Sequence, residues 1–344
     1  MSIEKFMASK VKEINYKKLN QLAHDIAKRN NKSVFYVKCS MIKNFLQYGI
    51  GYTDYLKGDY INLTKEQKKT FVTTKSYNRL LKYLNNTKYD ATMSDKLIFN
   101  KIFRDYIKRE YIDLRVTSLE EFKKFIKDKK NIFAKPPTDF GGHGIRKIAV
   151  KEIKDVEKLY LDLKKNKLNL IEEEIIQHPE LDKLNKYAVN PFRVVTLVKD
   201  GKSYVVGNAI RINIDDNAIV GCQDAYMRLS EDGKVSSRVV DDVANVYEEH
   251  PIVKIKFDEV RVPFVKEAFE LALKAALLVP EIRYVGWDIA ITKDGPVLLE
   301  GNEYPSYGLV QYYLFNDEHE GHLKTISKIL KEEMKKIKLW KKIN

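Results

Sequence analysis

Cysteine and long apolar runs are scarce in this sequence, and each absence excludes a class of protein. The 344 residues include two cysteines, Cys39 and Cys222, in unrelated contexts. They exclude a disulfide framework and a multi-cysteine zinc site, and they fit a reducing compartment. No stretch approaches the ~20 uninterrupted apolar residues of a membrane helix. The N-terminal MSIEKFMASKVKEI is charged, unlike a secretory signal. We therefore expect a cytoplasmic protein.

Acidic residues are outnumbered by basic ones, 48 against 62, which gives a net charge of +14. Such an excess favours anionic partners such as nucleotide phosphates, nucleic acid, acidic glycans or a membrane surface. The sequence contains neither an RNA-recognition signature nor a helix-turn-helix with an obvious reading helix, so no nucleic-acid partner is expected.

The chain is long enough for two or three compact units that share one cleft. Residues 1–115 carry apolar residues at helical spacing and are predicted to be mainly helical, with SVFYV at 33–37 as the one strand-like run. Residues 116–180 mix helices, short strands and a Gly-rich loop. Residues 181–319 are rich in strands, and residues 320–344 form a basic amphipathic helix.

Three Asp-Gly pairs, at residues 200–201, 232–233 and 294–295, lie between alternating apolar runs and predict β-hairpins. Hairpins make much of a sheet antiparallel. Together with the order of helices, strands and glycine loop, they predict an α+β protein.

Two acidic residues stand on the arms of the last predicted hairpin. A turn centred on residue 294 places Asp288 and Glu300 directly opposite, with their Cβ atoms ~4.5–5.5 Å apart. Asn302, two residues beyond Glu300, then faces the same side. Two carboxylates and an amide oxygen suit Mg²⁺, which would offset the like charges. The alternatives are a solvent-facing acidic pair, or a two-residue turn that shifts the register by one and separates the two faces.

A lysine and a group of glycines form the second candidate element. Lys135 ends the strand NIFAK, and Gly141, Gly142 and Gly144 follow in PPTDFGGHGI. Glycines allow backbone N–H groups to approach phosphates, and the lysine supplies a point charge. The order of lysine and glycines excludes a P-loop. A mobile surface loop is the alternative. Taken alone, Lys96 near a helix start reads as a surface lysine.

The middle strands carry charged residues in apolar surroundings. LIEEEIIQH (170–178) could line an adenine pocket or form an edge strand with a charged outer face. Arg193 and Arg211 lie on successive apolar strands and require acidic or phosphate partners. Structural salt bridges and a phosphate site remain open for both arginines.

Taken in this order, these segments resemble the ATP-grasp superfamily. FAKPPTDFGGHGI is similar to its strand, lysine and glycine loop over the ATP phosphates, and DIAITKDGPVLLEGNEYP to its metal-binding Asp…Glu-x-Asn motif. The resemblance is strongest to the sugar-transfer-associated ATP-grasp family and covers roughly residues 40–315. It implies an ATP-grasp fold, in which two α+β subdomains clamp ATP, preceded by the helical N-terminal region. Residues 116–180 would be the lid and residues 181–319 the metal and substrate subdomain.

The same resemblance implies a nucleotide site. Lys96 and Lys135 would hold the α- and β-phosphates, and the loop glycines Gly141, Gly142 and Gly144 would cover them. The residues implied for the adenine pocket are Glu172, Glu173 and Ile175. The ribose would be reached by His178 or Glu180.

For the metal and the transferred phosphate, the resemblance implies a second set of roles. Asp288 would bind one Mg²⁺, Glu300 would bridge two ions and Asn302 would complete the second site; Mn²⁺ could substitute. Arg193, Arg211 and Lys135 would act in catalysis. On the substrate side, the implied residues are Asn217 and Arg211.

The function implied is that of an ATP-dependent carboxylate–amine ligase with an acyl-phosphate intermediate, acting on a small molecule or on a sugar-linked or cell-surface polysaccharide precursor. Two alternatives are a phosphotransferase acting on a hydroxyl, and a polyanion- or membrane-surface-binding protein with a vestigial ATP site. The C-terminal helix has an apolar stripe that could touch an anionic membrane or dock on the protein core. The stripe comprises Leu323, Ile326, Leu330, Met334, Ile337 and Trp340.

Overall fold

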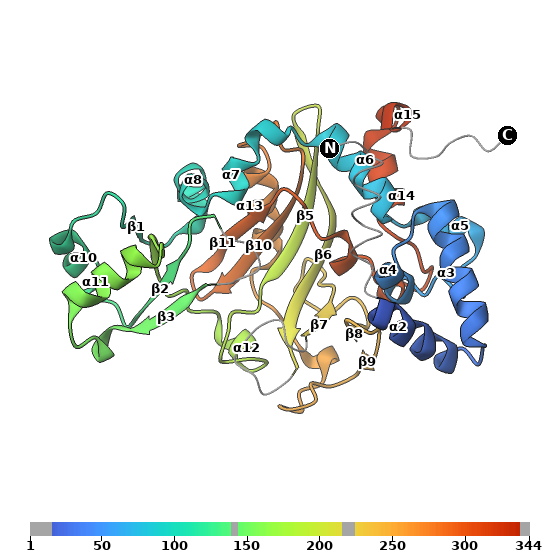
Figure 1. The fold of residues 1–344 in the computed structure, drawn as a ribbon, viewed down its shortest axis with the longest axis horizontal. Helices are drawn as coiled ribbons and strands as arrows, with labels where there is room; N and C mark the ends of the chain where they lie inside the picture. Colours follow the sequence, from blue (N-terminus) through green and yellow to red (C-terminus); the bar gives the residue numbers. More distant parts are fainter. Residues whose placement is uncertain (1–15, 139–143, 215–223, 338–344) are drawn as a thin grey trace.

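The computed structural model describes residues 16–138, 144–214 and 224–337, and within them the strands form two antiparallel sheets. The four-stranded sheet lies at one end of the molecule, the seven-stranded sheet in the middle, and the first helices at the other end (Figure 1). The α+β class predicted from the hairpins is confirmed.

The N-terminal region is helical, as predicted. Its helices are α2 (Tyr16–Arg29), α3 (Val34–Tyr48), α4 (Tyr52–Lys57), α5 (Lys65–Thr70), α6 (Thr74–Leu84), α7 (Ala91–Ser94), α8 (Lys96–Ile102) and α9 (Arg104–Ile107).

The strand-like run SVFYV is not a strand but the beginning of α3. Ser33 is the N-cap, and its side-chain oxygen accepts a hydrogen bond from the amide of Tyr36. Gly49 ends the helix at φ 72°, a conformation that glycine adopts without strain. The cap outweighs the β propensity of the valines and aromatic residues.

The four-stranded sheet has the order β1-β4-β2-β3 and is packed against two helices. Its strands are β1 (Tyr111–Asp113), β2 (Asn131–Lys135), β3 (Arg146–Ala149) and β4 (Leu170–Glu173), and the helices are α10 (Leu119–Ile126) and α11 (Val156–Lys165). Ser118 and Glu121 form the predicted capping box of α10. Phe122, Leu163 and Ile171 are buried between sheet and helices. β1 lies just inside the proposed helical region, whose boundary at residue 115 stays a prediction.

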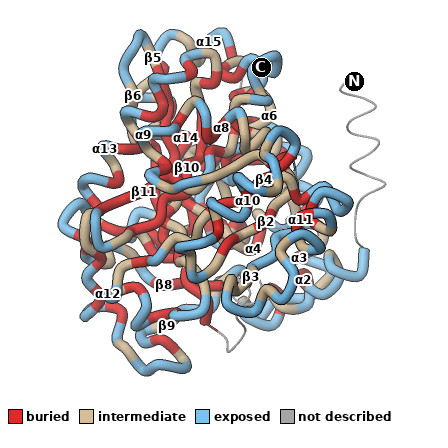
Figure 2. The backbone as a smooth tube through the Cα atoms, turned by 90° about the vertical axis from the view of Figure 1, so that its left-hand side faces the viewer, coloured by how far each residue is buried: buried red, intermediate tan, exposed pale blue. Residues whose placement is uncertain are grey.

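The seven-stranded sheet has the order β11-β10-β5-β6-β7-β8-β9. Its strands are β5 (Phe192–Lys199), β6 (Lys202–Asn213), β7 (Asp224–Met227), β8 (Val239–Asp241), β9 (Val246–Tyr247), β10 (Tyr284–Thr292) and β11 (Gly295–Asn302). The short helix α12 (Pro179–Asp182) precedes β5, and α13 (Val265–Ala275) packs on one face of the sheet. β10 and β11 run through the buried interior (Figure 2).

The C-terminal segment packs on the other face of this sheet. It consists of two short helices, α14 (Leu323–Leu330) and α15 (Glu333–Ile337), rather than the single helix predicted. The chain turns at Lys331, which has φ 47°. Leu323, Ile326 and Leu330 are buried against strands of the sheet. This part of the stripe therefore docks on the core and is not available to a membrane; Trp340 lies outside the described residues.

No helix in the described ranges is both long enough and apolar enough to span a lipid bilayer.

Candidate nucleotide and metal site

The last hairpin places Asp288 and Glu300 opposite each other, as the sequence predicts, but by a different route. The turn has two residues, because Thr292 pairs with Gly295 and Ile289 with Leu298. This register alone would put Asp288 and Glu300 on different faces. A β-bulge then inserts Leu299 as an extra residue, and beyond it Asp288 pairs with Glu300. The bulge thus restores the acidic pair that the turn would have separated.

Asn302 completes the predicted oxygen-donor set. It pairs with Gly286 and faces the same side as Glu300. Its Nδ2 donates to the carbonyl oxygen of Gly286 at 3.4 Å. The amide nitrogen is therefore turned to the backbone, and Oδ1 remains for a cation. No group of three or more His, Cys, Asp or Glu side chains suited to a metal occurs in the described residues.

On the side of β10 away from β11, Asp288 pairs with Arg193 of β5. Its Nε donates to Oδ1 of Asp288 at 2.5 Å, and its Nη2 donates to Oδ2 at 2.8 Å. Nη1 is buried and has no hydrogen-bond partner among the described residues. The structural salt bridge considered for Arg193 is therefore present, and one donor of the same side chain is left for another acceptor.

The carboxylate of Glu300 lies between these charges. Loss of water around the carboxylate raises the pKa of Glu300, and the Asp288 carboxylate raises that pKa further. Part of the Glu300 residue is nevertheless exposed to solvent. Arg193 and Lys96 act in the opposite direction. A cation placed between the two carboxylates would remove their repulsion, so the donor set fits Mg²⁺.

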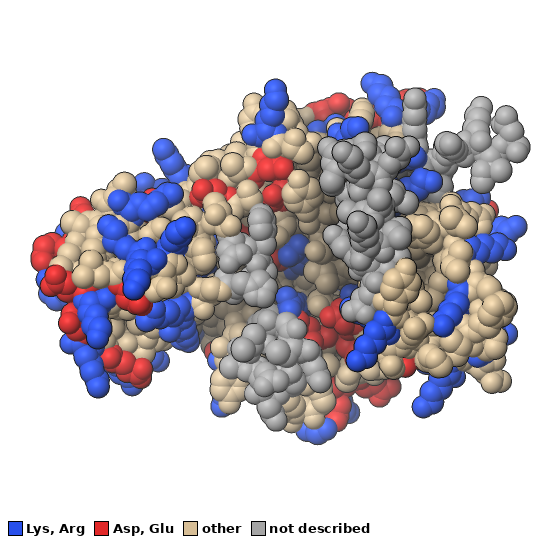
Figure 3. Space-filling model, in the orientation of Figure 1, with Lys and Arg blue, Asp and Glu red and all other residues tan. Residues whose placement is uncertain are grey.

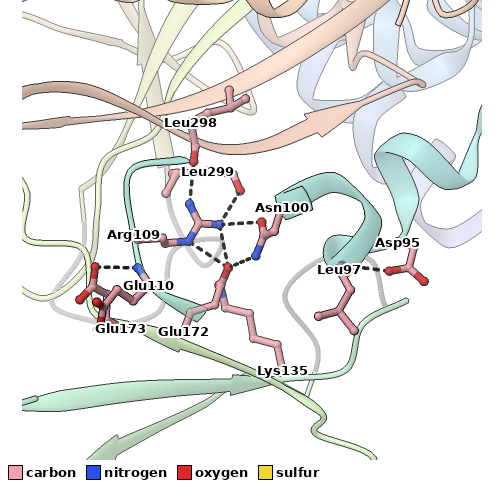
Figure 4. Close-up of polar contacts among 10 residues, drawn as sticks. All are labelled: Asp95, Leu97, Asn100, Arg109, Glu110, Lys135, Glu172, Glu173, Leu298 and Leu299. Atoms are coloured by element: carbon pink, nitrogen blue, oxygen red, sulfur yellow. Dashed lines mark hydrogen bonds and ion pairs between the residues drawn. The ribbon is translucent and has the colours of Figure 1, made fainter. Parts of the chain in front are cut away.

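Glu172 links the two sheets through a buried polar cluster (Figure 4). The residue is 2% exposed. Its Oε2 accepts from Lys135 Nζ at 2.6 Å, and its Oε1 accepts from Arg109 Nε and from Asn100 Nδ2, both at 2.9 Å. Burial raises the pKa of Glu172, but the Arg109 and Lys135 charges outweigh it and hold that pKa well below its usual range.

Arg109 connects this cluster to the hairpin of β10 and β11. Its Nη1 donates to the carbonyl of Leu298 at 2.6 Å, and its Nη2 donates to the carbonyl of Leu299 at 3.2 Å. Leu299 is the bulge residue, so one guanidinium joins the four-stranded sheet to the backbone that sets the position of Glu300. Sequence reasoning missed Arg109 and Asn100, because in IFNKIFRDYIKRE they resemble the polar residues around them.

One small cavity brings together five of the predicted residues: Lys96, Lys135, Glu172, Glu300 and Asn302. Asn100 and Arg109 also line it. Lys96 is the first residue of α8, and its amide donates to the carbonyl of Pro137, which follows Lys135 closely in the chain. The cavity has a volume of about 60 Å³, far below the ~300–1,000 Å³ typical of small-molecule pockets. This cavity alone is therefore too small for a whole nucleotide.

Of the residues predicted around the adenine and ribose, Glu172 lines this cavity and the other four do not. Glu172 turns its carboxylate to Lys135 and Arg109, as described above. Glu173 accepts from the amide of Glu110 and from Lys129. His178 caps α12 through Nδ1, and its amide donates to Ile291. Two further predicted residues are Glu180, which pairs with Lys183, and the half-buried Ile175.

Arg211 stands on β6 on the same sheet face as Arg193, because Ala209 pairs with Arg193 and lies two residues away. It forms an ion pair with the buried Asp224 on β7. This face is hollowed over the middle of the sheet, and side chains of both charge signs lie beside the hollow (Figure 3).

Gly141, Gly142 and Asn217 lie outside the described residues. Gly144 is described and has φ 74°, a conformation that favours glycine.

A family model described as "Sugar-transfer associated ATP-grasp" matches residues 76–319. The chain belongs to this family of the ATP-grasp superfamily, which confirms the resemblance and the ATP-grasp fold that it implied.

Solved structures show weaker likenesses. The ATP-grasp ligase PsnB, complexed with minimal precursor, Mg and ADP, is 17% identical with a TM-score of 0.36; the match covers 65% of this chain and 54% of PsnB. D-alanyl-alanine synthetase A from Vibrio cholerae is 14% identical with a TM-score of 0.43, over 70% of this chain and 64% of that one. VanG D-Ala:D-Ser ligase from Enterococcus faecalis is 14% identical with a TM-score of 0.43, over 69% and 60%. This chain thus spans less than two thirds of these proteins. No curated protein sequence matches it.

Proposed function

We propose that this protein is an ATP-dependent ligase that joins a carboxylate to an amine at a Mg²⁺–ATP site. The observation that carries the proposal is the shared cavity, where Lys96 and Lys135 approach Glu300 and Asn302. Two lysine ammonium groups suited to binding phosphates lie there beside oxygen ligands suited to Mg²⁺, and these side chains come from different elements of the fold. Membership of the ATP-grasp family supports the same reading.

Asp288, Glu300 and Asn302 would hold the metal. Mg²⁺ bound there would neutralise phosphate charge and orient the transferred group, with Glu300 between two ions and Mn²⁺ as a substitute. Asp288 would share its carboxylate between the ion and Arg193. The spare Nη1 of Arg193 would donate a hydrogen bond to an anionic oxygen beside the ions, which supports a role for Arg193 in neutralising the transferred phosphate.

Nucleotide binding would require the cavity to open. Lys135 donates to Glu172 at 2.6 Å, and nucleotide phosphates would replace Glu172 as its partner. The four-stranded sheet would move away from the hairpin to admit the nucleotide, while Glu172 keeps Arg109 and Asn100 as partners. In this scheme, Glu172 holds the lysine in place before the substrate arrives.

The chemistry follows from charge placement. A substrate carboxylate oxygen attacks the γ-phosphorus, the bond to ADP breaks, and an acyl phosphate forms. An amine then attacks the acyl carbon, phosphate leaves, and the amine loses a proton. Lys96, Lys135 and Arg193 would position and neutralise the phosphates throughout, so the protein contributes orientation and electrostatics.

The substrate would lie on the hollowed face beside Arg211, with Asn217 as a further contact. The family description favours a sugar-linked or cell-surface polysaccharide precursor as one substrate. An ADP-release screen with Mg²⁺, over amino acids and nucleotide-sugars singly and in pairs, tests the proposal. We expect release that needs two co-substrates and yields an amide.

Other outcomes contradict the ligase assignment. A stable phosphorylated product without an amide would identify a phosphotransferase acting on a hydroxyl. Failure to bind ADP with Mg²⁺ would favour a vestigial site in a protein that binds polyanions or membranes. Glu300→Gln is the matched control, because it keeps the shape of the side chain while removing a metal-binding charge.

A further inference from the structure

Helix α3 has apolar residues on two opposite sides. Val37, Met41 and Tyr48 are buried against the neighbouring helices. Facing outward are Phe35, Ile42 and Leu46, which are 77%, 60% and 72% exposed, with the exposed Cys39 between them. Spacings of three and four residues place these outward side chains in one stripe along the helix. We name Phe35, Cys39, Ile42 and Leu46 the outer face of α3.

Positive charge borders the outer face on both sides. By helical spacing, Lys38 lies along one edge of the stripe and Lys43 along the other. Lys32 precedes the helix, and its ammonium lies 6.0 Å from the centre of the Tyr36 ring, on the Lys43 side. Residues 26–53 include five basic residues and no acidic one.

A further lysine from α5 adds to this charge. Burial lowers the pKa of Lys68, and the Lys43 ammonium lowers it further. Neither lysine forms an ion pair within the part of the chain that the structure describes. An uncompensated positive cluster around an apolar stripe fits a negatively charged partner.

The charge distribution decides among the possible occupants. In a symmetric pair of copies, the lysine-edged stripe would meet itself, and no acidic residue of this segment could offset the repulsion. The stripe belongs to one convex helix with only a shallow depression lined by Cys39, Ile42, Lys43, Leu46 and Gln47. A convex helix with an apolar centre and basic edges matches a lipid surface, which deforms around it.

We propose that the outer face of α3 binds an anionic membrane surface. Phe35, Ile42 and Leu46 would enter the boundary between headgroups and acyl chains, and the lysines would contact lipid phosphates and carboxylates. α3 lies at the end of the molecule remote from the four-stranded sheet, so the proposed membrane contact lies far from that sheet (Figure 1). This membrane contact is independent of the ligase assignment.

Vesicle sedimentation with the full-length protein tests the proposal. The protein should bind vesicles of equal parts phosphatidylcholine and phosphatidylserine, and bind phosphatidylcholine alone far more weakly. The double variant Ile42→Gln/Leu46→Gln should lose at least about tenfold in affinity. Lys38→Gln and Lys43→Gln should each lose about fivefold, and added salt should weaken binding further.

Leu161→Gln is the matched control. Leu161 is 58% exposed on α11, at the other end of the molecule, and the variant should bind vesicles like the natural protein. An unchanged Tm in all variants shows that the fold is kept. Equal vesicle binding by the natural protein and the Ile42→Gln/Leu46→Gln variant overturns the proposal, as does failure of the natural protein to bind.

A fluorophore on Cys39, with Cys222 replaced by serine, distinguishes the other occupants. Its emission should shift to the blue on phosphatidylserine vesicles and stay unshifted in buffer at all protein concentrations. A shift with rising protein concentration and no vesicles would assign the face to a second copy. A shifted, vesicle-insensitive emission in buffer would mean that the chain itself covers the face. Both results overturn the proposal.

Discussion

Asp288 and Glu300 are direct cross-strand partners on β10 and β11 because Leu299 forms a bulge between them and the hairpin turn. Like charges in opposed positions destabilise a hairpin. The protein keeps this pair beside Arg193 and Lys96, whose charges oppose the rise in the pKa of Glu300. The opposed charges destabilise the hairpin, and a cation bound between them would remove that repulsion.

Replacing Glu300 by glutamine should therefore separate stability from activity. In the absence of metal, the variant should be more stable by up to about 1 kcal/mol, because the opposed charges are gone. Its ATP turnover should fall at least ~100-fold. Chemical unfolding with EDTA and ADP-release assays check the two effects. Asp294→Asn, an exposed change in the turn of the same hairpin, should alter neither.

Arg109→Lys should impair the site even though Arg109 is assigned no contact with the reacting groups. Lysine cannot reproduce the fork that reaches Glu172 and the carbonyls of Leu298 and Leu299. We expect a loss of ~3 kcal/mol in the free energy of unfolding and a lower kcat, since Glu300 loses its fixed backbone. Arg104→Lys on the exposed side of α9 is the control. If Arg109→Lys had the same free energy of unfolding as the natural protein, Arg109 would not be an important link between the two sheets.

Glu172 should give stability a defined dependence on pH. Its folded-state pKa is held below the usual value of 4.5. Because the unfolded chain then binds the proton more readily, the stabilising contribution is present above about pH 4.5 and is lost as the pH falls below it. Glu172→Gln should cost ~3 kcal/mol at neutral pH, and the difference from the natural protein should shrink in acid.

The control for that measurement is Glu120→Gln. Glu120 pairs with Lys123 on the surface with its side chain 81% exposed, so its removal should cost less than ~1 kcal/mol at any pH. A Glu172→Gln difference that stays constant from neutral to acidic pH would argue against the charge cluster.

Lys135→Gln tests the phosphate contact. Its KM for ATP should rise by ~10–100-fold, the scale of losing one charge-assisted hydrogen bond. Lys147→Gln removes a similar charge from the adjacent strand β3, where Lys147 pairs with Glu174, and should leave the KM unchanged. Equal KM values for ATP in both variants would contradict the assignment of Lys135 to the nucleotide site.

Sequence reasoning predicted the antiparallel sheets, the capping box at Ser118 and the opposition of Asp288 and Glu300, because each rests on a local pattern. The sequence predicts the pairing of Asp288 with Glu300 correctly, but from a turn centred on residue 294. In the structure the two-residue turn shifts the register by one residue, and the bulge at Leu299 shifts it back. Bulges depend on tertiary contacts such as Arg109 to Leu299, and these have no signal in the local sequence.

Other features depended on context that a sequence window does not contain. SVFYV has strand propensity, yet the Ser33 cap and packing on α2 make it helical. The C-terminal pattern continues at helical spacing through Lys331, where the chain turns and the helix ends. The roles predicted for Glu173, Ile175, His178 and Glu180 follow from family resemblance and stay predictions.

Calorimetric titration with ADP tests the central claim, that the hairpin from Asp288 to Asn302 is a Mg²⁺–nucleotide site, most directly. The natural protein should bind ADP at least ~10-fold more tightly with Mg²⁺ than with EDTA. Glu300→Gln should bind ADP with one weak affinity in both conditions. An equal gain from Mg²⁺ in Glu300→Gln and in the natural protein would contradict the account.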